Sequence, residues 1–194
     1  AQQASTEADL VRRALAARLG DVTNAATMLA NDPSVLSAIQ AGGADALETL
    51  NRRAILVSNR LHLDVVQIYN RQAQARVNLM YSSLYQEPLL LDAVEAQSPG
   101  IRVIRGRVLL LQRAEMPNGA GTVITGLDME TELHRLTTTR RLSSDLGLCF
   151  ESVCIGTREG LLLDAARGRS RGYDTQRIIV PIGDAIVELL LVRP

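Results

Sequence analysis

A change in hydrophobic period near residue 62 most constrains what this chain can fold into. Before it, apolar side chains recur every three or four residues, which is the period of an amphipathic helix. After it, runs rich in β-branched residues alternate with turn residues, as is typical of strands. Helices followed by strands predict an α+β domain. We therefore expect an N-terminal helical segment over residues 1–62 and a sheet core over residues 63–194, together forming one domain.

The helical segment divides at its glycines and prolines. The apolar stripe of the first helix consists of Leu10, Val11, Leu15, Leu19, Val22, Ala26, Met28 and Leu29. Gly20 weakens this helix by about 1 kcal/mol relative to alanine. Asp32-Pro33 ends it and begins a second helix, because Asp caps a helix and Pro suits its first position. The second helix has a partly apolar face of Val35, Leu36, Ile39 and Leu47, with Gly42-Gly43 loosening its middle, and a third short pattern covers residues 51–61.

The strands are connected mainly by hairpins. The predicted strands are residues 63–70, 75–83, 101–115, 122–129, 148–155, 161–165, 177–181 and 185–192. Asn70–Gln74 is one turn, and Pro117–Gly121 is another, because Asn-Gly tolerates positive φ angles. Gly106 predicts a bulge or break in a long strand. Helices over residues 89–97 and 130–146 interrupt the strands. Because hairpins dominate, we expect a mostly antiparallel sheet.

Composition and charge exclude several classes of function. An apolar share of 46% indicates a folded core. A formal net charge of zero and an aromatic share of 3% argue against nucleic-acid binding. All 21 basic residues are arginine, which excludes every lysine chemistry. No run of 18 apolar residues occurs, so we expect no membrane span within the chain. Its abrupt ends suggest a segment of a longer protein.

The cysteines and histidines predict neither a disulfide nor a metal site. On one extended strand, Cys149 and Cys154 would point to opposite faces, so we expect two small core residues and no intrachain bridge. His62 and His134 have no Cys or acid at ligand spacing, so we expect no metal and no other cofactor. The chain has no dinucleotide fingerprint. We therefore expect no enzymatic activity and no catalytic residues.

Arginines, tyrosines and one acid are candidates for binding a ligand. Arg105 and Arg107 share one face of a regular strand, where two guanidinium groups can hold a carboxylate or a phosphate. The alternative is a solvated sheet face. Asp128 fits both a ligand contact at a strand end and a helix N-cap. Two tyrosines on neighbouring strands could line a pocket or simply pack in the sheet. The predicted ligand-binding residues are Tyr69, Arg76, Tyr81, Arg105, Arg107 and Asp128.

Three segments together resemble the extracytoplasmic Cache- and CHASE-type sensor domains of bacterial transmembrane receptors. The first is the strand over residues 63–70 (LDVVQIYN). The second, residues 119–136 (GAGTVITGLDMETELHRL), is similar to the family's Gly-x-Val-x-x-Gly-x-Asp strand and its following helix. The third is the closing segment over residues 172–194. The chain has no Trp, whereas the amino-acid-binding subfamily uses one, and Ala73 stands near the family's usual turn glycine.

The resemblance implies a PAS-like fold, with a long N-terminal helix packed on a mostly antiparallel sheet. It also implies an extracytoplasmic location, in a protein of the inner or plasma membrane whose spans flank this segment. Such a domain would bind a small molecule and relay binding to a histidine kinase, a chemoreceptor or a cyclic-nucleotide enzyme. It would pair as a homodimer through the N-terminal helix. The alternative is a ligand-free module that dimerises or docks a partner protein and has no concave polar pocket.

Overall fold

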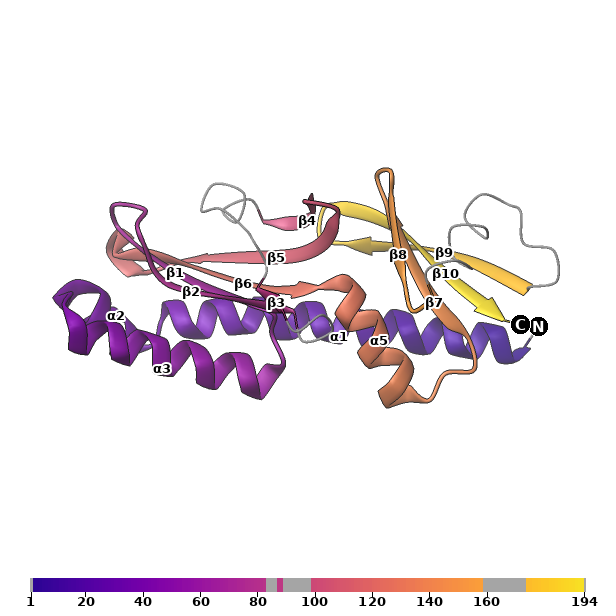
Figure 1. The fold of residues 1–194 in the computed structure, drawn as a ribbon, viewed down its shortest axis with the longest axis horizontal. Helices are drawn as coiled ribbons and strands as arrows, with labels where there is room; N and C mark the ends of the chain where they lie inside the picture. The colour runs from indigo at the N-terminus through magenta and orange to yellow at the C-terminus, as the bar shows by residue number, and fades with distance from the viewer. Residues whose placement is uncertain (1, 83–86, 89–98, 159–173, 194) are drawn as a thin grey trace. The chain divides into compact units, whose positions relative to one another are not determined.

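The computed structural model describes residues 2–82, 87–88, 99–158 and 174–193 and confirms the expected α+β class (Figure 1). The chain folds into two compact units. Unit 1 comprises residues 1–19, 100–109 and 128–194, and unit 2 comprises residues 20–99 and 110–127. The division expected from sequence at residue 62 stays a prediction. Within the described ranges, no helix has the length and apolar character needed to cross a membrane.

The helices of unit 2 follow the capping signals of the sequence. Residues 20–30 of α1 (Gln2–Ala30) belong to this unit, followed by α2 (Pro33–Ala41) and α3 (Ala44–Leu61). The Asp32 side chain accepts hydrogen bonds from the first amides of α2, as predicted. The expectation that the second helix continues through Gly42-Gly43 to Leu47 is wrong, because these glycines have φ angles of 67° and 87° and separate α2 from α3.

The strands of unit 2 form an antiparallel arrangement in the order β3-β2-β1-β6-β5. Their bounds are Val65–Asn70 for β1, Ala75–Ser82 for β2, Glu87–Pro88 for β3, Arg107–Glu115 for β5 and Gly121–Asp128 for β6. The Asn70 side chain accepts hydrogen bonds from two amides of the β1–β2 turn. A short 3-10 turn, Pro117–Gly119, connects β5 to β6. Both hairpin turns predicted from sequence are therefore confirmed.

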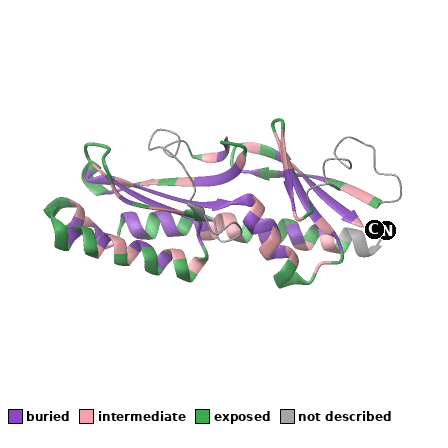
Figure 2. Ribbon diagram, viewed as in Figure 1, coloured by how far each residue is buried: buried purple, intermediate pink, exposed green. Residues whose placement is uncertain are grey.

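The two faces of this sheet differ in what covers them. Thr125 on β6 donates a hydrogen bond of 2.7 Å to the carbonyl of Val22 on α1, so its face packs against the helix. Side chains alternate along a strand, so Val65, Gln67 and Tyr69 on β1 point to the opposite face. We call this opposite surface the Tyr69 face. Buried residues follow the strands of the sheet in Figure 2, and Tyr69 itself is 1% exposed.

Unit 1 contains a hairpin where the sequence suggested one long strand. β4 (Gly100–Ile104) is hydrogen-bonded to β5, and Arg105-Gly106 forms the turn between them. Both turn residues have positive φ angles, 52° and 77°. A two-residue turn of this kind matches the twist of the flanking strands. The break predicted at Gly106 is confirmed, but the expectation that Arg105 and Arg107 share a strand face is wrong.

The remainder of unit 1 is one helix and a second antiparallel sheet. The helix is α5 (Met129–Arg140), and the sheet has the order β8-β7-β10-β9. The strands are β7 (Asp145–Phe150), β8 (Val153–Gly156), β9 (Asp174–Ile182) and β10 (Ala185–Arg193). The predicted hairpin near the end of the chain corresponds to β9 and β10.

Two sequence predictions near α5 and β3 need correction. The helix expected over residues 130–146 ends at Arg140, because Arg141 is left-handed with a φ angle of 48°. Leu146 is therefore the second residue of β7 and not the last turn of a helix. Glu87–Pro88, which the sequence predicts to open the next helix, is a two-residue strand. The helix predicted over residues 89–97 and the strand predicted over residues 161–165 lie outside the described residues.

Candidate functional site

One carboxylate connects the two ends of the chain within unit 1. Glu7 on α1 accepts hydrogen bonds from the Ser143 amide at 2.9 Å and from the Ser143 and Ser144 hydroxyls at 2.6 Å each. The same carboxylate accepts a hydrogen bond of 2.9 Å from Nη2 of Arg193, which lies on the last strand. We call these four residues the end cluster. Figure 1 shows the two chain ends side by side, so the cluster joins the first helix to the last strand.

The end cluster should make the stability of the protein depend on pH in the acidic range. Burial raises the pKa of Glu7, but the hydrogen bonds from Ser143, Ser144 and Arg193 outweigh it and lower the pKa from 4.5 to about 2. A pKa depressed by folding stabilises the protein above the unfolded-state value, and this contribution disappears as pH falls from 4.5 towards 2. We expect Glu7→Gln to be less stable than wild type at pH 7 and equally stable near pH 2.

Thermal melting followed by circular dichroism between pH 7 and pH 2 measures this effect. Asp9→Asn is the matched control, because Asp9 lies on the same helix with a side chain 53% exposed in its pair with Arg12. Exposed pairs contribute little to stability. The control should therefore melt in parallel with wild type. If the melting temperature of Glu7→Gln also changes with pH in parallel with that of wild type, the end cluster does not hold the ionised carboxylate that the structure shows.

A buried carboxylate on α5 connects this helix to α1. Glu132 is 1% exposed, and Nε of Arg18 on α1 donates to its Oε1 at 2.8 Å. Arg135, one turn further along α5, pairs with its Oε2. Ion pairs with little exposure depend on both partners, because an unpaired buried charge is strongly destabilising. Glu132 therefore fixes α5 against the first half of α1 within unit 1.

The structure brings together two of the predicted ligand residues, Arg107 and Asp128. Asp128 is 1% exposed, and Nη2 of Arg107 donates to its Oδ2 at 2.9 Å. The Thr131 hydroxyl donates to the same oxygen at 3.1 Å. Asp128 is the N-cap residue of α5 by position, but its side chain makes no capping hydrogen bond to the helix. These contacts compensate the charge of Arg107 and fix the start of α5.

The other predicted ligand residues do not form one group. Arg105 is exposed in the β4–β5 turn of unit 1. Tyr69, Arg76 and Tyr81 lie in unit 2, the last two on β2. Met80 is paired with Val65 of the Tyr69 face, so its neighbour Tyr81 points to the other face by alternation. The two tyrosines therefore lie on opposite faces of the sheet, and Tyr81 is 49% exposed.

Tyr69 instead lines a polar cleft of about 230 Å³ within unit 2. Thr122 is opposite Tyr69 in the β1–β6 register and shares its face. Glu115 accepts a hydrogen bond from the Thr122 hydroxyl at 3.0 Å and from Nε of Arg113 at 2.7 Å. Arg71 closes the cleft by donating to two carbonyls of the β5–β6 turn. This cleft offers a guanidinium, a carboxylate and a hydroxyl within a small volume.

The sequence interpretation missed Arg113 and Glu115 as cleft residues. Their signal was present, since two charges two residues apart share a strand face and directly precede the Pro117–Gly121 turn. That turn brings them opposite Thr122 and the end of β1. The charges were not singled out because nothing in the sequence pairs β6 with β1.

The two cysteines form a disulfide, which corrects the sequence prediction. β7 and β8 are two arms of a hairpin, and Cys149 is paired directly with Cys154 across it, with a Cα–Cα distance of 4.1 Å. The expectation of opposite faces assumed one continuous strand, and the chain reverses at Glu151, whose φ angle is 53°. Disulfides persist mainly in oxidising compartments such as the periplasm and the extracellular space.

Removal of this disulfide should destabilise the protein moderately. The bridge closes a short loop with a sequence separation of 5. By restricting the unfolded chain, it contributes about 2 kcal/mol to the free energy of unfolding. We expect a Cys149→Ser, Cys154→Ser double variant to melt several degrees below wild type. Dithiothreitol should lower the melting temperature of wild type by a similar amount and leave the variant unchanged. Equal melting of oxidised and reduced wild type would contradict this prediction.

The combination of a long first helix and two antiparallel sheets is similar to the fold of solved periplasmic and extracellular domains, as the resemblance predicted. The periplasmic domain of Vibrio cholerae LuxQ is similar at a TM-score of 0.66 and 12% identity, covering 95% of this chain and 96% of that one. The extracellular domain of the proposed histidine kinase vpHK1S-Z8 is similar at a TM-score of 0.60 and 12% identity, covering 100% and 95%.

A third structure extends the similarity to another kind of signalling protein. It is a domain of a proposed sensory box/GGDEF family protein from Vibrio parahaemolyticus, with a TM-score of 0.59 and 12% identity, covering 98% of this chain and 97% of that one. No protein-family model matches the chain, and no curated protein matches it. TM-scores of 0.59 to 0.66 show a common fold, whereas the sequence identities are only 12%. They do not transfer a ligand.

Proposed function

We propose that this chain is the extracytoplasmic sensor domain of a membrane-bound signal-transduction receptor and that it carries no catalytic activity. The observation that carries the proposal is the fold, which covers at least 95% of this chain in each of the three comparisons. Two features of the chain support it. The Cys149–Cys154 disulfide fits an oxidising compartment. The adjacent chain ends suit a domain held between two flanking membrane segments.

The proposed signal passes through the end cluster. Glu7 holds the first helix to Arg193 on the last strand and to the two serines before β7. A ligand shifts such an arrangement only if it binds one state more tightly than the other. Ligand binding would therefore change how these two chain ends are held, and flanking segments would carry the change to a histidine kinase, a chemoreceptor or a cyclic-nucleotide enzyme.

The proposed ligand is a small anion in the cleft of unit 2. Arg113 and Arg71 are cations at this cleft; the Arg113 side chain is 38% exposed, and Tyr69 and Thr122 line the wall. An incoming carboxylate or phosphate would compete with Glu115 for the guanidinium group. In this proposal Arg107 and Asp128 position the start of α5, because their charges already compensate each other at 2.9 Å.

A thermal-shift screen tests ligand binding by the purified chain. Succinate, glutamate, inorganic phosphate and adenine serve as probes for carboxylates, amino acids, phosphates and nucleobases. A probe at about one hundred times its dissociation constant adds about 2.7 kcal/mol of stability. We expect at least one anionic probe to raise the melting temperature by several degrees. Arg113→Gln should abolish the shift, whereas Arg52→Gln, an exposed arginine on α3, should retain it.

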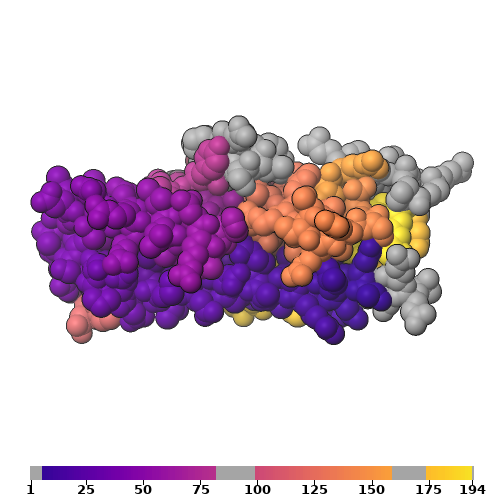
Figure 3. Space-filling view, turned by 90° about the horizontal axis from the view of Figure 1, so that it is seen from below, coloured from indigo at the N-terminus to yellow at the C-terminus, as the bar shows by residue number. Residues whose placement is uncertain are grey.

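A second candidate function is a ligand-free module that dimerises or docks a partner protein. Large apolar side chains on the helices favour it, because Met28, Ile55 and Leu56 are 55%, 45% and 58% exposed. Ile55 and Leu56 lie on α3, and Figure 3 shows the side of the molecule on which α2 and α3 face the viewer. Exposed apolar side chains often mark protein contacts when they form a patch. This function would be favoured if no probe raises the melting temperature and if sedimentation velocity shows a dimer that forms as the protein concentration rises. The homodimer expected through α1 would be one such dimer.

A further inference from the structure

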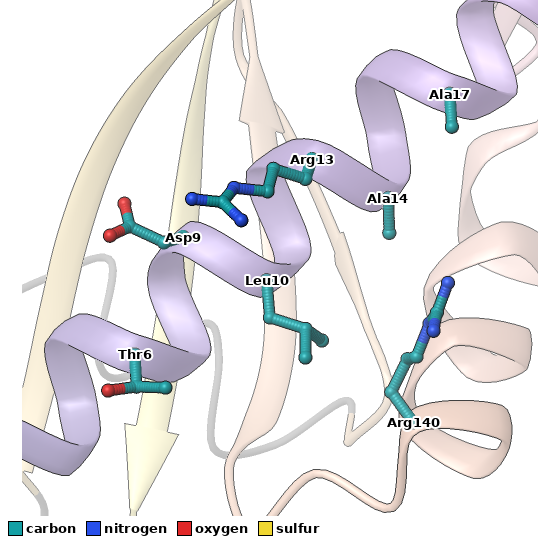
Figure 4. A pocket seen from close by; sticks show the side chains of 7 residues that line it. All are labelled: Thr6, Asp9, Leu10, Arg13, Ala14, Ala17 and Arg140. Carbon is teal, nitrogen blue, oxygen red and sulfur yellow. The ribbon is translucent and has the colours of Figure 1, made fainter.

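A groove of about 480 Å³ lies along the first half of α1 in unit 1 and is lined by none of the cleft residues described above (Figure 4). Leu10, Ala14 and Ala17 form its apolar floor, following one another along the helix. Arg140, the last residue of α5, points towards the groove from the opposite wall. Small-molecule pockets typically have volumes of about 300–1,000 Å³. The groove is therefore large enough for a ligand and mainly apolar at its base.

The rim of the groove carries an excess of positive charge. Arg13 and Arg140 both line it and are exposed, and neither forms an ion pair among the residues that the structure describes. The one rim acid, Asp9, is already paired with Arg12 at 3.1 Å. A guanidinium group beside an apolar surface that forms no ion pair within the described residues, as at Arg140, matches an anion that also has an apolar portion.

We propose that this groove binds a small amphipathic anion, an acyl-chain carboxylate or a similar molecule. Its apolar chain lies over Ala14 and Ala17, and its anionic head pairs with Arg140, whereas the Arg13 guanidinium group points towards Asp9 in Figure 4. A second copy of the chain is a poorer occupant. A two-fold pairing of this groove with itself would set the same arginine-rich rim against its copy, and like charges repel.

The groove adjoins the residues that hold the chain ends. Leu10 is one helical turn after Glu7, and Arg140 shortly precedes Ser143 and Ser144, which bind Glu7. A molecule in the groove therefore contacts the two segments that the end cluster joins. If the chain is a sensor, occupancy of the groove would bias that cluster directly. This link rests on the proposed function, whereas binding in the groove does not.

Isothermal titration calorimetry with decanoate, below its micelle concentration, tests the site on the whole chain. We expect saturable one-to-one binding, with no binding of acetate, which lacks the chain, and weaker binding of uncharged octyl glucoside. Ala17→Asp places a carboxylate on the floor and should weaken decanoate binding by about tenfold or more. Ala16→Asp is the matched control, because Ala16 is the neighbouring exposed alanine outside the groove lining.

The charge requirement is tested in the same way. Arg140→Gln should weaken decanoate binding by about tenfold, because a charge-assisted contact is lost. Arg141→Gln, the adjacent exposed arginine outside the groove lining, should bind as wild type does. Absence of decanoate binding, or equal binding by Ala17→Asp and wild type, would overturn the proposal. A dimer that Ala17→Asp alone dissociates, without decanoate binding, would overturn it in favour of a second copy.

These outcomes are separate from those of the sensor proposal. Decanoate binding that depends on Arg140 would establish the groove even if the cleft of unit 2 binds no probe. Conversely, a thermal shift that depends on Arg113 would support the sensor function even if decanoate does not bind. Circular dichroism of each variant before titration confirms that the fold is retained.

Discussion

Replacing Glu132 with alanine is expected to lower the free energy of unfolding by about 3–5 kcal/mol. The carboxylate is 1% exposed, and its two partners, Arg18 and Arg135, have side chains only 15% and 24% exposed. Alanine would leave both guanidinium groups without the acid that compensates them. At about 2–4 °C per kcal/mol for a chain of this size, the melting temperature should fall by about 10 °C. Urea unfolding followed by circular dichroism measures the change.

Glu48→Ala is the matched control for this prediction. Glu48 is also a helical acid paired with an arginine, but the side chains of Glu48 and Arg52 are 71% and 73% exposed. A surface pair of this kind contributes about 0–1 kcal/mol. Both substitutions replace glutamate by alanine in a helix, so their difference isolates the effect of burial. Equal losses in the two variants would show that Glu132 is not held in a buried ion-pair network.

The second large effect is expected at Gly126, in the middle of β6. A Cβ atom added there would lie 2.7 Å from the carbonyl oxygen of Leu110 and 2.7 Å from a methyl group of Leu111. Neither the strand backbone nor the buried side chain can move away without disturbing the sheet. We expect Gly126→Ala to lower the free energy of unfolding by about 3 kcal/mol.

Gly20→Ala is the control with the opposite sign. Gly20 lies within α1, and a Cβ atom there would meet nothing within 4 Å. Alanine is favoured over glycine in a helix by about 0.5–1 kcal/mol, so this variant should be more stable than wild type. Urea unfolding of both variants gives the comparison. A neutral or stabilising Gly126→Ala would mean that β5 and β6 are not packed as the structure shows.

The sequence predicted the elements whose signals are local. Asp32-Pro33 marked the end of one helix and the start of the next, and Asn118-Gly119 marked a hairpin, because capping and positive φ angles depend on neighbouring residues. The errors concern where an element stops. The left-handed conformation of Arg141 has no strong sequence signal, so α5 was extended into β7. The same kind of reversal at Glu151 turned one expected strand into the hairpin that carries the disulfide.

The candidate sites were harder to predict because they join distant segments. Glu7 and Arg193 are 186 residues apart, and neither has a neighbour that signals a partner. Arg107 and Asp128 were both selected from the sequence and do lie together, but as partners of each other. Tyr69 and Tyr81 were selected for lying on neighbouring strands. The register of the β1–β2 hairpin decides that they point to opposite faces, and periodicity alone does not specify that register.

In the proposed sensor, ligand binding changes how the two chain ends are held. Hydrogen–deuterium exchange, with and without saturating succinate, glutamate, phosphate or adenine, tests it most directly because amide exchange reports local opening. We predict that a probe which raises the melting temperature also changes exchange in residues 143–144 and 190–193, beside Glu7, and does not change exchange in α2. A stabilising probe that leaves both end segments unchanged, or four probes that do not bind, would contradict the account.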